Sequence, residues 1–167
     1  MEAKVDSQRL LLRSLDPKSD NLSHYLSWMR DVENNLFIES VKRDMTLREL
    51  QSYISDKNRS ESALLLGIFE KSSKMHIGNV KLELNCSRQD ACLGMLIGSR
   101  EMRGKSFGYD AIKLLADFAK NEYSLISIYL GVDIKNIAAV KLYEKLGFIP
   151  ENTYKEVQNR ILMRLML

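Results

Sequence analysis

A glycine-bearing basic loop, residues 103–108 (RGKSFG), stands directly before a segment whose apolar residues have helical spacing. Main-chain N–H groups at the start of a helix have no intrahelical acceptor, and the helix dipole adds partial positive charge there. Glycine lets a ligand approach the backbone closely, and Arg103 and Lys105 add positive charge. The loop is therefore suited to a diphosphate, although an ordinary strand-to-helix turn can have the same composition.

A second segment, residues 136–148 (NIAAVKLYEKLGF), has the pattern of a short helix with polar groups at its start and middle. Asn136 can cap this helix, and Gly147 fits the position after a helix end, where a left-handed backbone is common. Tyr143 either packs in the core, as most tyrosines on helix faces do, or presents its hydroxyl to a ligand. The residues alone leave both alternatives open.

Two nucleotide-binding motifs are excluded at the basic loop. A P-loop has Lys and then Ser or Thr after its second glycine, whereas Gly108 is followed by Tyr109 and Asp110. A dinucleotide-binding unit needs G-x-G-x-x-G after a parallel strand, whereas the sequence here lacks that motif and predicts antiparallel strands before the loop.

Together, the two segments resemble the GNAT superfamily of acetyltransferases, whose signature joins Q/R-x-x-G-x-G/A to a later N-x-x-A-x-x-x-Y-x-x-x-G-F. The residues at matching positions are Arg103, Gly108, Asn136, Ala139, Tyr143, Gly147 and Phe148. The resemblance covers residues 9–167 and is most detailed over residues 76–148. Ser106 departs from the signature because it replaces a glycine. If its N–H still faces the ligand, the diphosphate is held and the hydroxyl adds a bond, whereas a required left-handed backbone would cause strain and weaken cofactor binding unless Gly104 relaxes the constraint.

The resemblance implies the GNAT fold, an α/β fold of the α+β type with helices on both faces of a twisted sheet. That sheet is mixed but mostly antiparallel and has about six or seven strands. Residues 1–167 would form a single GNAT domain, an acetyl-CoA-dependent N-acetyltransferase that uses no metal. The residues that the resemblance places at the cofactor are Met95, Leu96, Ile97, Arg103, Gly104, Lys105, Ser106, Phe107, Gly108, Tyr109, Asn136 and Tyr143.

The family mechanism gives several of these residues a role. Acetyl-CoA would lie between residues 95–97 and a strand at residues 125–132, where an amine attacks the thioester directly. Main-chain N–H groups of residues 95–97 would polarise the carbonyl. Tyr143 would act as general acid toward the CoA thiolate, and Asn136 would hold the pantetheine arm.

The general base is less well marked than the acid. Many relatives have a glutamate at the position that aligns with Cys92. Glu83 is therefore the predicted base, while Glu39, His24 and an ordered water remain alternatives.

Two segments bear on the acceptor, residues 25–31 (YLSWMRD) and 76–82 (HIGNVKL). They resemble enzymes that acetylate protein N-termini, notably of ribosomal proteins, and enzymes that acetylate nucleotide-linked amino-sugars. The run at residues 77–82 favours the amino-sugar, and a peptide N-terminus is the alternative. Trp28 would stack on a sugar or base, or else pack in the core. A non-catalytic CoA-binding module is less favoured, because Tyr143 supplies a proton donor that a binder does not need.

The elements that must position these residues follow from hydrophobic periodicity. Strands are predicted at residues 9–13, 63–69, 77–84, 91–97, 125–132, 148–154 and 161–167. One or two short helices are predicted within residues 21–35, and further helices at 46–56, after residue 108 and at 136–146. Thr46 and Glu49 form a capping box, in which each satisfies a free N–H group of the other.

Composition is that of an ordinary globular protein, since 45% of the 167 residues are hydrophobic and 28% are charged. We expect a cytoplasmic protein without a membrane partner, because the sequence has neither a membrane-spanning apolar run nor a signal-peptide pattern. The net charge of +3 is spread along the chain and so predicts no nucleic-acid partner. Relatives are often dimers, and the resemblance therefore suggests a homodimer.

Cysteine and histidine are scarce. Cys86 and Cys92 flank a polar turn and are expected to be reduced thiols. His24 and His76 lie far apart in the sequence and neither joins a cysteine at ligand-like spacing, so no metal site is predicted.

Overall fold

The computed structural model describes residues 3–33, 35–37, 44–85, 87, 89–151 and 159–167. The strands are β1 (Lys4–Asp6), β2 (Leu10–Arg13), β3 (Ala63–Glu70), β4 (His76–Asn85), β5 (Asp90–Ile97), β6 (Ser127–Asp133), β7 (Ile149–Pro150) and β8 (Arg160–Met166). The helices are α1 (Ser23–Arg30), α2 (Leu47–Arg59), α3 (Phe107–Tyr123) and α4 (Ile137–Lys145), with a 3-10 turn η1 (Arg100–Met102) between β5 and α3.

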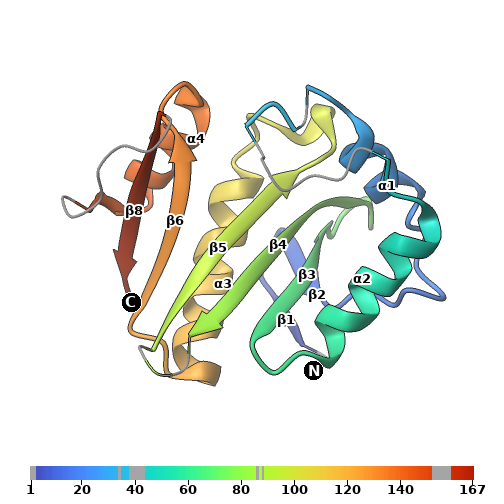
Figure 1. The fold of residues 1–167 in the computed structure, drawn as a ribbon, viewed down its shortest axis with the longest axis horizontal. Coiled ribbons are helices and arrows are strands. Elements are labelled where there is room, and N and C mark those ends of the chain that lie inside the picture. The colour runs from blue at the N-terminus through green and yellow to red at the C-terminus, as the bar shows by residue number, and fades with distance from the viewer. Residues whose placement is uncertain (1–2, 34, 38–43, 86, 88, 152–158) are drawn as a thin grey trace.

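All eight strands belong to one sheet of order β1-β2-β3-β4-β5-β6-β8-β7 (Figure 1). Every neighbouring pair is antiparallel except β5 with β6, which is parallel. The sheet exceeds the six or seven strands predicted, because the short strand β1, which was not predicted, is added at one edge. The strand expected at residues 148–154 is described only as Ile149–Pro150, and residues 152–158 lie outside the described part of the chain.

The strand expected at residues 125–132 begins two residues later, at Ser127. The N–H of Leu125 donates to the carbonyl of Ala119 at 3.4 Å, so this residue still closes the end of α3. Hydrophobicity alone therefore placed the start of the strand too early, since Leu125 is buried without belonging to it.

Helices cover both faces of the sheet, as the sequence predicts (Figure 1). Leu64 and Leu66 belong to the larger core, which packs α3 and α4 against the sheet, whereas Leu65 belongs to the smaller core under α1 and α2. Because successive side chains of a strand point to opposite faces, these two cores lie on opposite sides of β3. The smaller core also buries Trp28, which confirms packing as its role.

The capping box of α2 forms as predicted. The N–H of Glu49 donates to Oγ1 of Thr46 at 3.3 Å, and the N–H of Thr46 donates to Oε2 of Glu49 at 2.7 Å. Two helix-terminal donors are thereby satisfied, and the start of the helix is set by the sequence itself.

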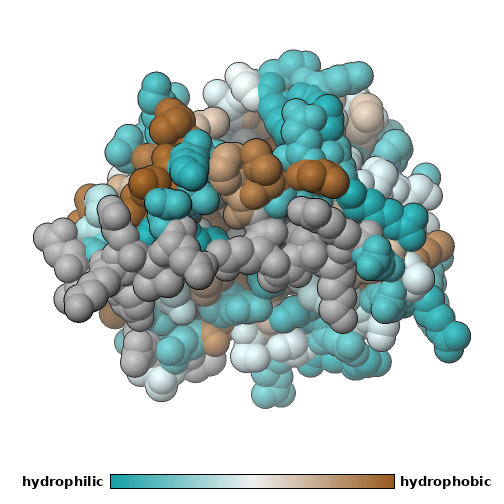
Figure 2. Space-filling view, turned by 45° about the horizontal axis from the view of Figure 1, so that its top comes forward, coloured by the Kyte–Doolittle hydropathy of each residue, from teal (hydrophilic) through white to brown (hydrophobic). Residues whose placement is uncertain are grey.

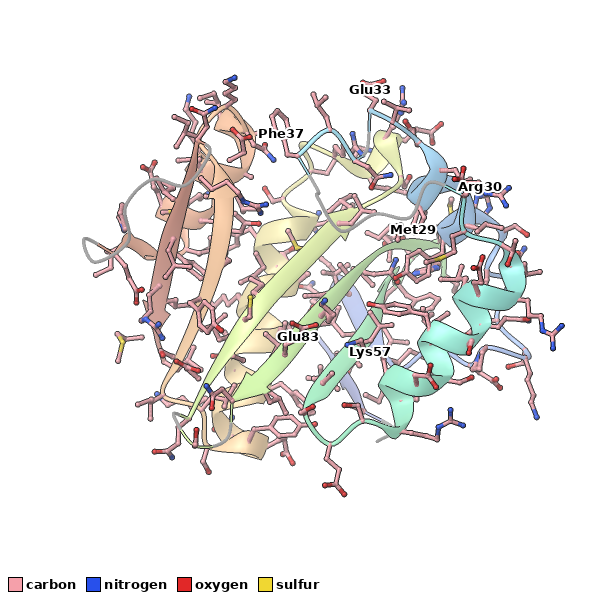
Figure 3. All side chains as sticks on the ribbon, in the orientation of Figure 1. Met29, Arg30, Glu33, Phe37, Lys57 and Glu83 are labelled. Carbon is pink, nitrogen blue, oxygen red and sulfur yellow. The ribbon has the colours of Figure 1, made fainter. Side chains whose placement is uncertain are left out.

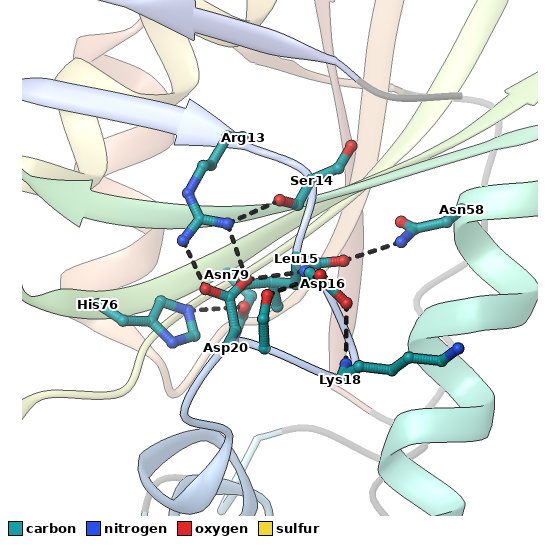
Figure 4. Close-up of polar contacts among 10 residues, drawn as sticks. Arg13, Ser14, Leu15, Asp16, Lys18, Asp20, Asn58, His76 and Asn79 are labelled. Carbon is teal, nitrogen blue, oxygen red and sulfur yellow. Dashed lines mark hydrogen bonds and ion pairs between the residues drawn. The ribbon is translucent and has the colours of Figure 1, made fainter.

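Two polar pairs lie side by side next to the smaller core (Figure 4). Arg13 donates to both carboxylate oxygens of Asp20, at 2.7 and 2.6 Å. His76 Nε2 lies 3.0 Å from Oδ1 of Asn79, and because an amide oxygen only accepts, the imidazole donates this bond. Burial lowers the pKa of His76 below its usual value, so the ring is neutral at physiological pH. His76 and Asn79 are thus engaged in holding the start of β4.

No helix within the described ranges is long and apolar enough to cross a bilayer.

Gly98, directly after β5, lies against the indole of Trp28. A methyl group at Gly98 would lie 2.0 Å from Cδ2 of Trp28, so Gly98→Ala must displace the indole or the strand end. We expect a loss of about 1–3 kcal/mol in the free energy of unfolding, measured by urea denaturation. Gly94→Ala is the matched control, because its methyl group would lie 3.7 Å from Cε of Lys81, an ordinary contact. Equal losses in the two variants would contradict this account.

Candidate active site

The pairing of β5 with β6 ends after three residue pairs, the last of which joins Cys92 to Tyr129. Beyond it β5 stays paired with β4 as far as Ile97, and β6 stays paired with β8 as far as Asp133. The two strands diverge from this point (Figure 1). Residues 93–97 consequently have no partner among the described strands on the side facing β6. Nε of Arg103 donates to the carbonyl of Ile97 at 3.0 Å, and the main-chain groups of residues 93–96 on that side are available to a ligand.

A cleft of about 800 Å³ opens where the strands part. Residues of β5, β6, α4, the loop before α3 and the segment after α1 line it. The charged residues described along its walls are Arg103, Lys141, Lys145, Arg160, Glu33 and Asp133. Cations outnumber anions there, which favours an anionic ligand.

Both apolar and polar residues line the cleft. Figure 2 shows hydrophobic patches interrupted by hydrophilic side chains on one face of the molecule. Inside the cleft, Leu93, Met95, Ile97 and Leu130 provide apolar walls. The cleft therefore suits a ligand that has both an apolar arm and a charged end.

The loop before α3 has an unusual backbone. Gly104 has a φ of +72° and Ser106 a φ of +65°, so both residues are left-handed. Ser106 is the N-cap of α3, and its hydroxyl makes no capping bond within the described chain. The first N–H groups of α3 thus have no side-chain acceptor at the N-cap, which leaves them for an anion. Serine holds this conformation at a cost of about 1–2 kcal/mol that glycine would avoid.

Tyr143 lies near the C-terminal end of α4, lines the cleft and is 9% exposed. Its ring packs against Phe148 at a centroid distance of 5.6 Å. Burial raises the pKa of Tyr143 to about 12, so its hydroxyl is protonated at every physiological pH. The tyrosine therefore packs in the core and also lines the cleft, while the role of its hydroxyl toward a ligand stays a prediction.

Asn136 also lines the cleft, at the N-terminus of α4. Its Oδ1 accepts a bond of 3.2 Å from the N–H of Ala139, so the side chain caps the helix. Gly147 has a φ of +91° at the other end of α4, in agreement with the predicted helix stop.

The structure brings together at this cleft all but one of the residues predicted for the cofactor. Lys105 is the exception, because it is exposed and is not among the lining residues. Its carbonyl accepts a bond of 2.8 Å from Arg9 instead.

Glu83 lies outside the lining of the cleft. It is on the face of the sheet turned toward α2, where it lies near Lys57 (Figure 3). Oε1 of Glu83 accepts from Nζ of Lys81 at 2.8 Å and lies 3.5 Å from Nζ of Lys57. The hydrogen bond from Lys81 lowers the pKa of Glu83, which makes this carboxylate a weak base.

The other residues considered as a base or nucleophile lie in different settings. His24 stacks on Trp28 at a centroid distance of 6.4 Å, and Glu39 lies outside the described residues. Cys92 has a free thiol whose pKa is raised by burial, while Cys86 lies outside the described residues. The thiol is thus poorly suited to act as a nucleophile.

Some cleft residues were not predicted from the sequence. Glu33 and Phe37, in the segment after α1, reach the open end of the cleft (Figure 3). No local sequence pattern marks these two residues. Leu142 and Lys145 of α4 also line the cleft, at helical spacing from Ala138 rather than from Asn136.

The sequence pattern of the acetyltransferase (GNAT) domain family matches residues 9–149. The chain belongs to the GNAT acetyltransferase family. This acetyltransferase is 30% identical over 146 residues to spermidine N(1)-acetyltransferase from Vibrio cholerae, a match that covers 87% of this chain and 82% of the relative.

Solved structures of the family have the same fold. The crystal structure of spermidine N-acetyltransferase from Vibrio cholerae, in complex with CoA and spermine, superposes with a TM-score of 0.81 at 22% identity and covers 96% of each chain. A GNAT-family acetyltransferase from Bacillus anthracis gives a TM-score of 0.81 at 13% identity and covers 98% of each chain. The predicted fold class is thereby confirmed.

Among the described residues, no group of three or more His, Cys, Asp and Glu side chains is arranged to hold a metal ion. The expectation of a metal-free enzyme stays a prediction.

The left-handed Ser106 gives a direct test of the loop. Ser106→Gly is expected to raise the free energy of unfolding by about 0.5–1 kcal/mol, because glycine removes the strain at a small entropic cost. Ser124→Gly is the control, since Ser124 is also left-handed, with a φ of +52°, at the other end of α3. Both variants should be more stable in urea denaturation, and only Ser106→Gly should tighten acetyl-CoA binding in calorimetry. Equal tightening in both would contradict a local effect of Ser106.

Proposed function

We propose that this GNAT acetyltransferase transfers the acetyl group of acetyl-CoA to a primary amine that attacks the thioester directly. The observation that carries this proposal is the parting of β5 and β6 beside the N-terminus of α3. It puts unpaired main-chain groups, an anion-binding helix terminus and Tyr143 around one cleft. An apolar arm with amide groups fits the open edge of β5, and a diphosphate fits the loop that begins at Arg103.

Each part of the cleft has a role in this proposal. Main-chain N–H groups of residues 93–97 stabilise the negative charge that develops on the carbonyl oxygen. Tyr143 donates a hydrogen bond to the sulfur and supplies a proton to the leaving thiolate. A phenol with a pKa of about 12 is a weaker acid than an ordinary thiol, but burial also raises the pKa of a thiol held beside it. The pKa of the donor and the pKa of the leaving thiol therefore remain matched only where the sulfur is held beside Tyr143 in the cleft.

The assignment of the general base stays a prediction. Glu83 pairs across the strands with Cys92, at the point where β5 and β6 part, but two lysines already hold its carboxylate. The alternative is that a water bound near this point acts as the general base and accepts the proton of the amine.

For the acceptor, we propose a small aliphatic amine of the polyamine class. Support comes from the identity with spermidine N(1)-acetyltransferase and from Asp133, a carboxylate on the cleft wall that can attract a cationic amine. Glu33 also lines the cleft, but its carboxylate pairs with Arg100 at 2.8 Å. Two features that favoured an amino-sugar have structural roles instead. Trp28 is buried against Gly98, and the run at residues 77–82 forms the interior of β4.

Tyr143→Phe tests the role of the hydroxyl. The variant should bind acetyl-CoA within about twofold of wild type, because the ring and its packing against Phe148 remain. Its kcat should fall at least about tenfold, because the proton donor at the sulfur is lost. Calorimetry and a thiol-release assay measure the two quantities. Unchanged turnover would overturn the assignment of the acid, and tight binding without turnover in the wild-type protein would indicate a CoA-binding module.

The acceptor is tested by thiol release from acetyl-CoA with a panel of amines. Spermidine and related polyamines are expected to give a kcat/KM at least about tenfold above that of nucleotide-linked amino-sugars and of peptides with free N-termini. A clear preference for peptides or for amino-sugars would refute the polyamine assignment while leaving the acetyltransferase itself intact.

A further inference from the structure

Arg9, directly before β2, makes three contacts with the loop and first turn of α3. Nη1 donates to Oδ2 of Asp110 at 2.7 Å, and Nη2 donates to the carbonyl of Lys105 at 2.8 Å. The guanidinium carbon also lies 4.4 Å from the ring centroid of Phe107. Arg9 is not among the residues that line the cleft, so it holds the loop from outside.

The bond to Lys105 fixes the direction of one peptide group. The carbonyl of Lys105 and the N–H of Ser106 belong to the same peptide unit, and in a trans peptide these two groups point in opposite directions. A carbonyl held toward Arg9 therefore turns the N–H of Ser106 away from Arg9. Ser106 lines the cleft and has a left-handed backbone, so this bond holds a strained residue with its donor on the ligand side.

The bond to Asp110 cancels a charge that opposes the ligand. Asp110 is the acidic residue in the first turn of α3, where its carboxylate stabilises the helix dipole. The same carboxylate would repel a diphosphate bound at that helix terminus. An ion pair with Arg9 keeps the benefit to the helix and removes the net negative charge.

We propose that Arg9 is a positioning residue for the diphosphate of acetyl-CoA, an inference that rests on the proposed function. It acts without touching the cofactor, by directing the peptide between Lys105 and Ser106 and by neutralising Asp110. Arginine is suited to both tasks at once, because its planar fork donates in two directions, whereas lysine offers a single point charge.

Arg9→Met removes the hydrogen bonds to Asp110 and to the carbonyl of Lys105, and it keeps an apolar side chain over Phe107. The KM and the dissociation constant for acetyl-CoA are expected to rise about tenfold, with kcat and the KM of the amine within about twofold of wild type. Arg9→Lys should fall between these values, since it can pair with Asp110 but not with both partners. Arg48→Met, which removes an exposed arginine of α2, is the matched control and should change neither constant.

The double variant Arg9→Met/Asp110→Asn separates the two contributions. The double variant should recover at least half of the lost affinity for acetyl-CoA, on a logarithmic scale, because the carboxylate that Arg9 no longer neutralises has been removed. No recovery would refute the neutralisation of Asp110. An Arg9→Met protein that binds acetyl-CoA as tightly as wild type, or that loses kcat and both KM values together, would overturn the proposal. Failure of the wild-type protein to bind acetyl-CoA at all would instead refute the proposed function.

Discussion

The loss of strand pairing between β5 and β6 is the constraint on which the rest of the site depends. A sheet normally satisfies its main-chain groups through the next strand, and here that strand turns away after Cys92. The unpaired edge must find its hydrogen bonds in a ligand or in water. Everything else in the cleft is arranged around this edge: α3 begins at its open end, and α4 carries Tyr143 along the opposite wall.

The start of α3 combines a strained backbone with contacts that stabilise it. Ser106 adopts a conformation that glycine would adopt more easily, and the contacts of Arg9 help to hold it there. The neighbouring Asp110 stabilises the helix but opposes an anion, and the same arginine balances it. The terminus thus combines two requirements that conflict, a stable helix start and a site for negative charge.

Local patterns in the sequence predicted the elements whose ends are set by neighbouring residues. Thr46 with Glu49 marked the start of α2, and Asn136 with Gly147 marked both ends of α4. Patterns failed where contacts come from distant segments. Arg9 lies far from Lys105 in the chain, so its role was not visible in the sequence.

The residues proposed for the acceptor are harder to predict from the sequence than those proposed for the cofactor, for a related reason. The run at residues 77–82 favours a substrate role in the sequence, whereas its residues pair with β3 and β5 inside the sheet. Glu33 and Phe37 line the cleft although no local periodicity marks them. The residues proposed for the cofactor lie within short motifs, while those proposed for the acceptor come from separate parts of the fold.

Three residue pairs join β5 to β6, whereas seven join β6 to β8. The sheet therefore has a short seam, with β6, β7 and β8 on one side and the remaining strands on the other. A ligand in the cleft contacts both sides of this seam and adds to the forces that hold them together. By mass action, its contribution grows with the ratio of its concentration to its dissociation constant. If acetyl-CoA binds in this cleft as proposed, the stability of the C-terminal strands is linked to its concentration.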